Sequence, residues 1–358
     1  MNITDTKKLR DSMVKYTQRS TPLALLIFFT EVIIYLSAIA GIIFVDNIFI
    51  RMLCSMFAGL IISALYVVAH DAAHNSFTDS KRLNKVLARV SYLPSLHNYS
   101  LWLIAHNRLH HNNPNVQGIN SWSPFSKIEF DALPEWRKAV ERFYRSIFGM
   151  CFYYLVERWW QHKFFPFVKY TGERRPGQIM DFLLVAGYLV AFIWMLVYAG
   201  MKLAHTSPAE LIVLGFILPF LVWNFMGGAT IYQHHTHESL PWFRSNEERK
   251  RLCGQEDVTM HVRYPRWYNL LSLNIMQHTA HHINPGIPLY NLAQAQDALS
   301  KILDGQLLTV QFSPARFLQT VDRCKLYDYE HHRWLDFDGN PTSAMILEPE
   351  GVKYANVA

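Results

Sequence analysis

The 358-residue sequence has few cysteines and none of the local motifs that bind common soluble cofactors. Its four cysteines are far apart and form no CxxC pair, which excludes a disulfide scaffold and an iron–sulfur or rubredoxin-type electron carrier. The chain also has no HPGG haem signature, no GxGxxG fingerprint and no P-loop. Any electrons that the protein uses must therefore come from a separate chain.

Charged residues are also scarce. They make up 17% of the chain, whereas hydrophobic residues make up 51%, a mixture typical of a protein divided between membrane and water. The net charge of +6 could suggest nucleic acid, but Lys and Arg flank apolar runs, so a membrane surface explains them more simply. No low-complexity linker or internal repeat divides the chain. We therefore predict a single domain over residues 1–358 that binds no nucleic acid.

Four long apolar runs predict transmembrane helices, because each is long enough to cross about 30 Å of hydrocarbon. Only three residues separate the first two runs, and a short loop separates the last two. We therefore predict an all-α integral membrane protein whose four spans form two hairpins. The predicted spans are residues 22–44, 48–69, 179–201 and 209–231.

The charges around these runs predict the orientation of the chain. Basic residues precede the first span, whereas the loops on the opposite side carry almost no charge, so the positive-inside rule places both termini in the cytosol. The cytosolic regions are then residues 1–21, 70–178 and 232–358. Within them, the interrupted apolar stretches 86–105 and 148–167 predict interfacial or re-entrant helices, and the polar C-terminal part predicts a cytosolic cap of helices and loops.

Histidine is over-represented, with 17 copies, and most of them lie in clusters. His70 and His74, at the end of the second span, have the i,i+4 spacing that sets two imidazoles on one helical face. In the second cluster, His106 and His110 would share a face of an α-helix while His111 points about 100° away. Adjacent histidines of this kind could serve two neighbouring metal ions.

Two more clusters follow, at residues 233–238 and 278–282, and the i, i+3, i+4 spacing of the latter predicts three imidazoles that point roughly one way. Spans two and four both exit toward the cytosol, so all the clusters can meet on one side of the membrane. Buried neutral imidazoles need partners there, and a metal ion supplies them. The candidate metal ligands are His70, His74, His106, His110, His111, His235, His237, His278, His281 and His282.

Carboxylates are nearly absent from these clusters. Asp71 and Glu238 are the exceptions, and we expect them to hydrogen-bond histidines and hold their tautomers. Imidazole suits Fe, Zn, Cu and Ni alike, so the ligand type does not name the metal. Nine or ten histidines exceed the ligands of one tetrahedral zinc but suit two ions of coordination number five or six. The alternative to a metal site is a set of interfacial or core histidines, each hydrogen-bonded to a carbonyl or water.

The motifs HxxxH, HxxxHH and HxxHH, placed around two predicted hairpins, resemble the membrane fatty acid desaturase and hydroxylase superfamily over about Tyr66 to Ala295. Residues 70–77 (HDAAHNSF), 236–241 (THESLP) and 278–282 (HTAHH) are similar to the acyl-lipid desaturase segments HDCGHHAF, QHTHPSLP and HVAHH. By this match, the favoured ligand after the fourth span is His235, followed by His237 and then by His234, which takes the place of a glutamine.

The resemblance implies a histidine-caged di-iron centre, O2 as co-substrate and an external electron donor of the ferredoxin, cytochrome b5 or rubredoxin type. It implies a desaturase that removes hydrogens from an unactivated CH2 pair in a long acyl chain of a membrane lipid. However, three residues separate His106 from His110 where those desaturases usually have two, a spacing more like that of alkane hydroxylases. The alternative is therefore a membrane hydroxylase or ketolase that acts on an alkane, fatty acid or carotenoid. A metal transporter is disfavoured because the ligands gather at one surface and no repeat is visible.

Overall fold

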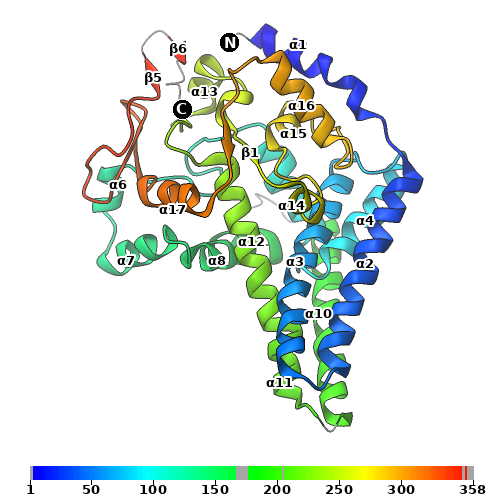
Figure 1. Ribbon diagram of the computed structural model, residues 1–358. Helices are drawn as coiled ribbons and strands as arrows, with labels where there is room; N and C mark the ends of the chain where they lie inside the picture. Colours follow the sequence, from blue (N-terminus) through cyan, green and yellow to red (C-terminus); the bar gives the residue numbers. More distant parts are fainter. Residues whose placement is uncertain (1–2, 167–175, 204, 349–350, 353–358) are drawn as a thin grey trace.

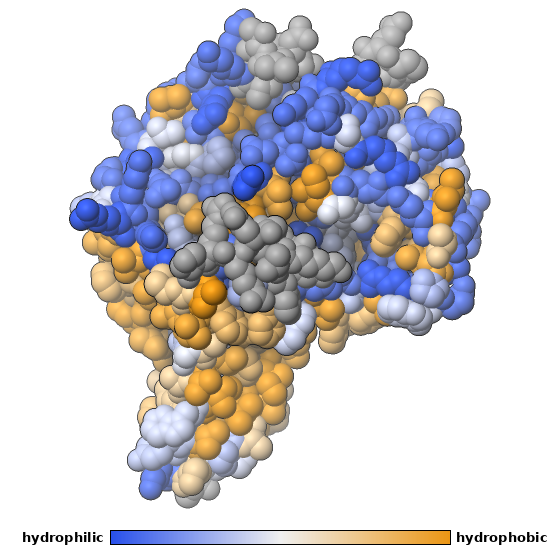
Figure 2. Space-filling model, turned by 180° about the vertical axis from the view of Figure 1, so that it is seen from behind, coloured by the Kyte–Doolittle hydropathy of each residue, from blue (hydrophilic) through white to orange (hydrophobic). Residues whose placement is uncertain are grey.

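The computed structural model describes residues 3–166, 176–203, 205–348 and 351–352. Long helices form a stalk, and a wider cap of shorter helices and strands covers one end of it (Figure 1). In Figure 2, apolar residues cover most of the stalk, and polar residues dominate the surface of the cap. This division of polarity is the one expected of a chain that is partly embedded in a membrane.

The stalk consists of four apolar helices that are long enough to cross a membrane, within the residues described. Helices thus form over all four of the predicted spans, and the second and fourth run several residues further toward the cap. The fourth is continuous through three segments with a wide, π-type turn in the middle. The bounds are α2 Thr21–Phe44, α3 Ile48–Ala73, α10 Pro176–Lys202, α11 Pro208–Ile212, η4 Val213–Ile217 and α12 Leu218–His235.

Local sequence signals start these helices. Pro22 lies in the first turn of α2, where a missing N–H costs nothing. The side chain of Asn47 caps α3 by accepting hydrogen bonds from the backbone N–H groups of Phe49 and Ile50. At the same end of the stalk, Arg51 is 1% exposed and forms an ion pair with Glu210 at the start of the fourth span. Its Nε also donates to the carbonyl of Ile42 in α2, so Arg51 joins α2, α3 and α11 at the end remote from the cap.

Helices α3 and α12 lie side by side, and their close approach requires a glycine. A Cβ atom on Gly59 would lie 2.5 Å from the Val222 side chain and 2.8 Å from the Pro219 carbonyl oxygen. Because any larger residue would push the helices apart, Gly59 keeps the two C-terminal ends together. Those ends carry His70 and His235 into the cap.

Between the second and third spans, the two interrupted apolar stretches form broken helices rather than further spans (Figure 1). Two of the segments, η2 and η3, are π-helices, with i→i+5 turns that are wider than those of an α-helix. Residue 167, the predicted end of the second stretch, lies outside the described residues. The bounds are α4 Lys81–Tyr92, α5 Tyr99–Trp102, η2 Leu103–His110, α6 Lys127–Asp131, α7 Glu135–Tyr144, α8 Gly149–Tyr153 and η3 Tyr154–Phe164.

The cap is largely helical, but it also contains strands, which the sequence analysis did not predict. In the described residues, a parallel pair joins β1 His261–Arg263 to β2 Thr309–Gln311, and two antiparallel pairs join β3 to β4 and β5 to β6. The other bounds are α1 Ile3–Ser12, η1 Val14–Thr17, α13 Asn246–Leu252, η5 Glu256–Val258, α14 Arg266–Leu271, α15 His278–Ile283, α16 Leu292–Ile302, α17 Pro314–Arg323, β3 Leu326–Asp328, β4 Arg333–Leu335, β5 Leu347–Glu348 and β6 Gly351–Val352.

Candidate metal centre

The first pair of histidines lies where α3 leaves the stalk. The helix continues to Ala73, and the backbone N–H of His74 donates to the carbonyl of His70, so the two residues are one α-turn apart. Their ring centroids are 4.7 Å apart. The i,i+4 spacing therefore acts as the sequence predicted and presents both imidazoles on one face.

The second cluster differs from the expectation because η2 is a π-helix. The N–H of His111 donates to the carbonyl of His106, an i→i+5 turn, and the Nε2 atoms of these two residues are 3.1 Å apart. His110 points elsewhere, with its Nε2 3.1 Å from that of His282. The rings of His106 and His110 remain neighbours, with centroids 5.0 Å apart, but the two residues belong to different groups of histidines.

This wide turn also explains the extra residue in the motif HxxxHH. A turn with i→i+5 bonding holds one residue more than an α-turn, so His106 and His111 align as an i,i+4 pair would in the shorter motif. The unusual spacing therefore leaves the imidazoles converging, and it no longer favours a hydroxylase over a desaturase.

Helix α15 divides its three histidines between two places. The ring of His281 packs against the rings of His70 and His74, at centroid distances of 4.6 and 4.9 Å. His278 and His282 face His235 instead, with centroids 5.0 Å from its ring in both cases. The expectation that all three imidazoles point one way was wrong. Helix α15 lies between two clusters of histidines, and it contributes His281 to one cluster and His278 and His282 to the other.

The structure separates the three histidines at the end of α12. The Nε2 of His235 lies 3.0 Å from that of His278. The ring of His234 stacks on the ring of His278 at a centroid distance of 3.6 Å. His237 joins neither centre: its Nδ1 accepts a hydrogen bond from the Ser239 N–H, and it lines a different cavity.

Two groups of histidines result, and within each the potential ligand atoms all lie within 4.8 Å of one another. His111 lies beside the first group, with its Nε2 3.1 Å from the Nε2 atoms of both His106 and His281. The first histidine group is His70, His74, His106 and His281, and the second histidine group is His110, His235, His278 and His282.

The spacing of the nitrogens fits metal ions better than hydrogen bonds. A neutral imidazole has one donor and one acceptor nitrogen, so a run of Nε2 atoms about 3 Å apart cannot all be paired by protons. Two nitrogens bound to one ion at right angles, with bonds of about 2.1 Å, lie roughly 3.0 Å apart, against about 3.4 Å in a tetrahedron. The pairs observed at 3.0 to 3.1 Å therefore fit five- or six-coordinate ions.

Burial favours the neutral form, which is the form that binds metal, in three of these imidazoles. Loss of water lowers the pKa of His111, His281 and His282 well below the usual value, and neighbouring histidines lower it further. The three side chains thus present free nitrogen lone pairs at neutral pH.

Amide side chains that the sequence analysis missed orient the second histidine group. The Nδ1–H of His110 donates to Asn120 at 2.5 Å, and that of His235 is shared between Asn115 at 3.0 Å and the Val258 carbonyl at 3.1 Å. His282 uses Gln255 at 3.2 Å. These contacts leave Nε2 free for a metal. No sequence pattern marks the three amides, because they lie at irregular separations of 10, 120 and 27 residues from the histidines that they contact.

The first histidine group has a carboxylate neighbour. Asp71 Oδ1 lies 3.5 Å from His70 Nδ1, while Oδ2 accepts a hydrogen bond from the Leu289 N–H at 2.5 Å, which ties α3 to the cap. Asp71 is thus placed beside a histidine as expected, but at 3.5 Å the two atoms form no hydrogen bond, so its role in holding the His70 tautomer stays a prediction. Glu238 is placed elsewhere, since its carboxylate pairs with Arg323 and not with a histidine of either group.

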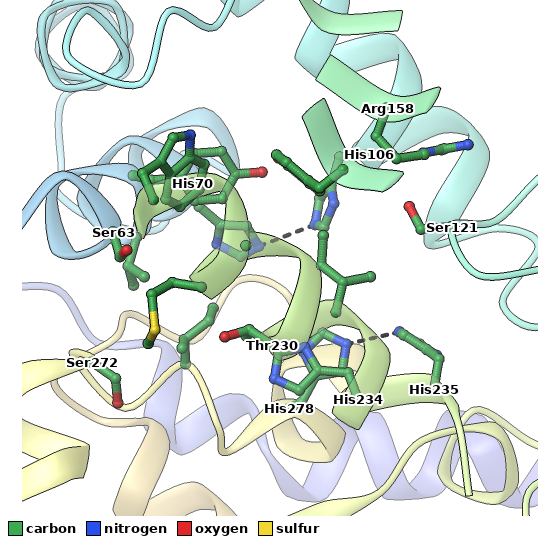
Figure 3. A pocket seen from close by; sticks show the side chains of 18 of the residues that line it. Ser63, His70, His106, Ser121, Arg158, Thr230, His234, His235, Ser272 and His278 are labelled. Carbon is green, nitrogen blue, oxygen red and sulfur yellow. Dashed lines mark hydrogen bonds between the residues drawn. The ribbon is translucent and has the colours of Figure 1, made fainter. Parts of the chain in front are cut away.

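A largely apolar cavity runs past both groups, between α3, α12 and the cap. In Figure 3, Arg158 and Ser121 lie on one side of it and Ser63 and Ser272 on the other, with the histidines between them. A flexible hydrocarbon chain could pass the metal centre within such a space. The apolar lining includes Leu60, Val67, Trp223, Met226, Leu271 and Ile275.

The fatty acid desaturase family model matches residues 47–314 of this chain. The chain belongs to the fatty acid desaturase family. This desaturase is 28% identical, over 76% of each chain, to an sn-1 oleoyl-lipid 12-desaturase of Picosynechococcus. It is 28% identical to the chloroplastic omega-6 fatty acid desaturase of Glycine max, over 77% of this chain and 62% of the relative. A sn-1 acyl-lipid omega-3 desaturase (ferredoxin) of Synechocystis is 27% identical over 73% of this chain and 70% of that protein.

Family membership and the four apolar helices make this desaturase an integral membrane oxidoreductase. The family and the relatives named as desaturases favour the desaturase interpretation over the hydroxylase or ketolase alternative.

Proposed function

We propose that this protein is an O2-dependent di-iron desaturase that introduces a double bond into a long acyl chain of a membrane lipid. The observation that carries the proposal is the pair of all-histidine groups, side by side, against one apolar cavity. Two iron ions bound there would supply the oxidising power, drawn from O2 and two electrons, that removes two hydrogens from a CH2–CH2 unit. We expect the first and second histidine groups to hold one ion each.

The residues present suit such ions. In the first histidine group, His111 adds a fifth imidazole, so that nine histidines converge and few positions remain for other ligands. His237 is left out of this proposed ligand set because its Nδ1 is already hydrogen-bonded and the ring lines a separate cavity. His235 is thus our preferred ligand at the end of α12.

The chain's own residues would bind and orient the substrate. The apolar side chains of α3 and α12 bury hydrocarbon, and Trp223, 2% exposed, closes part of the cavity wall. A buried cavity excludes water from the site, which protects the reacting carbon from side reactions. The relatives named as acyl-lipid desaturases support a chain esterified to a lipid as the substrate.

The orientation and the electron donor also belong to this proposal. Basic residues before α2 support cytosolic termini and a cytosolic metal centre, in two hairpins that form a single domain over residues 1–358. A relative whose name includes ferredoxin supports an external donor, and a cytochrome b5 or rubredoxin type would deliver the same electrons. No nucleic-acid partner is proposed.

The test is the product formed in a host that expresses the chain. Mass spectrometry of lipids should detect acyl chains lighter by two hydrogens, and His282→Ala should abolish them. His331→Ala is the matched control, because His331 is an exposed cap residue that pairs with Asp328. Products that carry an added oxygen atom would establish the hydroxylase instead, and unchanged lipids in an iron-replete host with a donor would contradict the proposal.

A further inference from the structure

The π-helix η3 places a row of polar side chains along the cavity. Tyr154, Arg158 and Lys163 all line it, at spacings of four and five residues. In an α-helix, Lys163 would point away from Tyr154, but the wider i→i+5 turn brings residues four to five apart into line. The helix type thus turns two cations toward a largely apolar cavity.

Lys163 is buried without an anionic partner among the described residues. It is 5% exposed, and the hydrogen bonds that its Nζ donates within that part of the chain go to phenol oxygens, to Tyr154 at 3.2 Å and to Tyr66 at 3.5 Å. Burial, with a smaller contribution from Arg158, lowers the pKa of the Lys163 ammonium to about 7. An isolated cation in such a place is costly, and a bound anion would remove the cost.

Arg158 also lacks an anionic partner among the described residues. Its Nε is buried and has no hydrogen-bond partner, and neither Arg158 nor Lys163 makes an ion pair with any residue in the described part of the chain. The adjacent carboxylate, Glu157, is already paired with Arg137 at 2.7 Å. A planar guanidinium with free donors matches the paired oxygens of a carboxylate or phosphate.

We propose that Arg158 and Lys163 form a subsite for the anionic head of the acyl substrate, a carboxylate or phosphate group. Figure 3 places Arg158 beside Ser121, on the side of the histidines opposite to Ser63 and Ser272. An acyl chain held by its head group at Arg158 would extend past the candidate metal centre toward the side of the cavity where Ser63 and Ser272 lie. The position of the new double bond would then be counted from the head group.

Binding of three probes with the same chain tests this subsite. Dodecyl phosphate, dodecanoate and dodecan-1-ol differ only in the head, and calorimetry on the metal-loaded full chain in nanodiscs, corrected against empty nanodiscs, measures each affinity. The wild type should prefer one or both anions over the alcohol by roughly tenfold or more, the value of a charge-assisted hydrogen bond. Tighter binding of phosphate would indicate a phospholipid head, and tighter binding of carboxylate a free fatty acid.

Variants of Arg158 test whether this cation causes the preference for anionic probes. Arg158→Gln should lose roughly tenfold in affinity for the anions while the alcohol is unaffected, and Arg158→Lys should keep most of the preference. Arg142→Gln, an equal charge change at an exposed position on α7, is the matched control and should bind all three probes as the wild type does.

Equal binding of the three heads by the wild type, or an equal loss for all three in Arg158→Gln with its metal content intact, would overturn the subsite. The first of these results needs no variant, so a folding defect cannot hide it. The inference rests on the proposed function, because it assumes that the cavity binds an acyl chain. Because binding needs no turnover, a protein that selects anions but forms no double bond would contradict the proposed function alone.

Discussion

The first and second histidine groups use the same ligand but are held in different ways. The first group begins with an α-turn at the end of α3 and has the carboxylate of Asp71 beside His70. The second group draws one or two side chains from each of three segments, and the amides of Asn120, Asn115 and Gln255 orient it. Each candidate site thus contains one i,i+4 pair, on α3 in the first group and on α15 in the second, and long-range packing supplies the other histidines.

This difference has an electrostatic consequence. A carboxylate next to a metal-bound histidine raises the basicity of the imidazole, whereas an amide fixes its orientation without adding charge. We therefore expect the first histidine group to hold its ion more tightly and the second to depend more on the rigidity of the surrounding cap.

The largest effect should come from removing one ligand from each group. His281→Ala affects the first histidine group and His282→Ala the second, so each should abolish turnover and lower iron from about two ions per chain to about one. Iron analysis of purified protein checks this. His237→Ala is the control, expected to retain iron and activity. A full iron content in both ligand variants would contradict the claim that each histidine group holds one ion.

A one-residue deletion should separate the two kinds of helical turn. Deletion of Leu109 can be absorbed when the π-turn of η2 tightens to an α-turn, which keeps His106 and His111 aligned. Deletion of Ala72 cannot be absorbed in this way, because the turn between His70 and His74 is already an α-turn. We expect the Leu109 deletion to keep most of its iron and the Ala72 deletion to lose it, as measured on protein recovered from membranes. Equal losses would refute this account of HxxxHH.

A smaller effect is expected when the carboxylate is made an amide. Asp71→Asn keeps an acceptor for the Leu289 N–H but removes the charge near His70, so the first histidine group should lose roughly 10- to 100-fold in metal affinity. Competition with a chelator measures the affinity. Asp79→Asn, on a carboxylate that accepts from Thr21, is the control. If Asp71→Asn released iron no faster than this control, the two groups would not differ in the way described.

The smallest effect should come from one amide of the second histidine group. Gln255 accepts from His282 and donates to the carbonyl of His111, so Gln255→Leu removes two neutral hydrogen bonds near the centre. Each is worth about 1 kcal/mol, or roughly fivefold. Turnover should fall by about that factor per bond while iron content is unchanged. Loss of all iron would mean that this amide does more than orient a ring.

The sequence was informative where structure depends on neighbouring residues. Apolar runs predicted the four long helices, and the HxxxH spacing predicted the α-turn of His70 and His74. It was less informative where packing decides. The π-turn of η2 depends on how its histidines meet α15, and Asn115 reaches His235 from 120 residues away. The strands β1 and β2 likewise pair although they are distant in the sequence, as 261–263 and 309–311.

The account depends most on the claim that both histidine groups bind iron at the same time. X-ray absorption at the iron edge, combined with metal analysis of the purified chain, tests this most directly. We predict about two irons per chain, each surrounded mainly by imidazole nitrogens at about 2.1 Å, with an iron neighbour detectable nearby. A single iron per chain, or two irons bound mainly by oxygen, would contradict it.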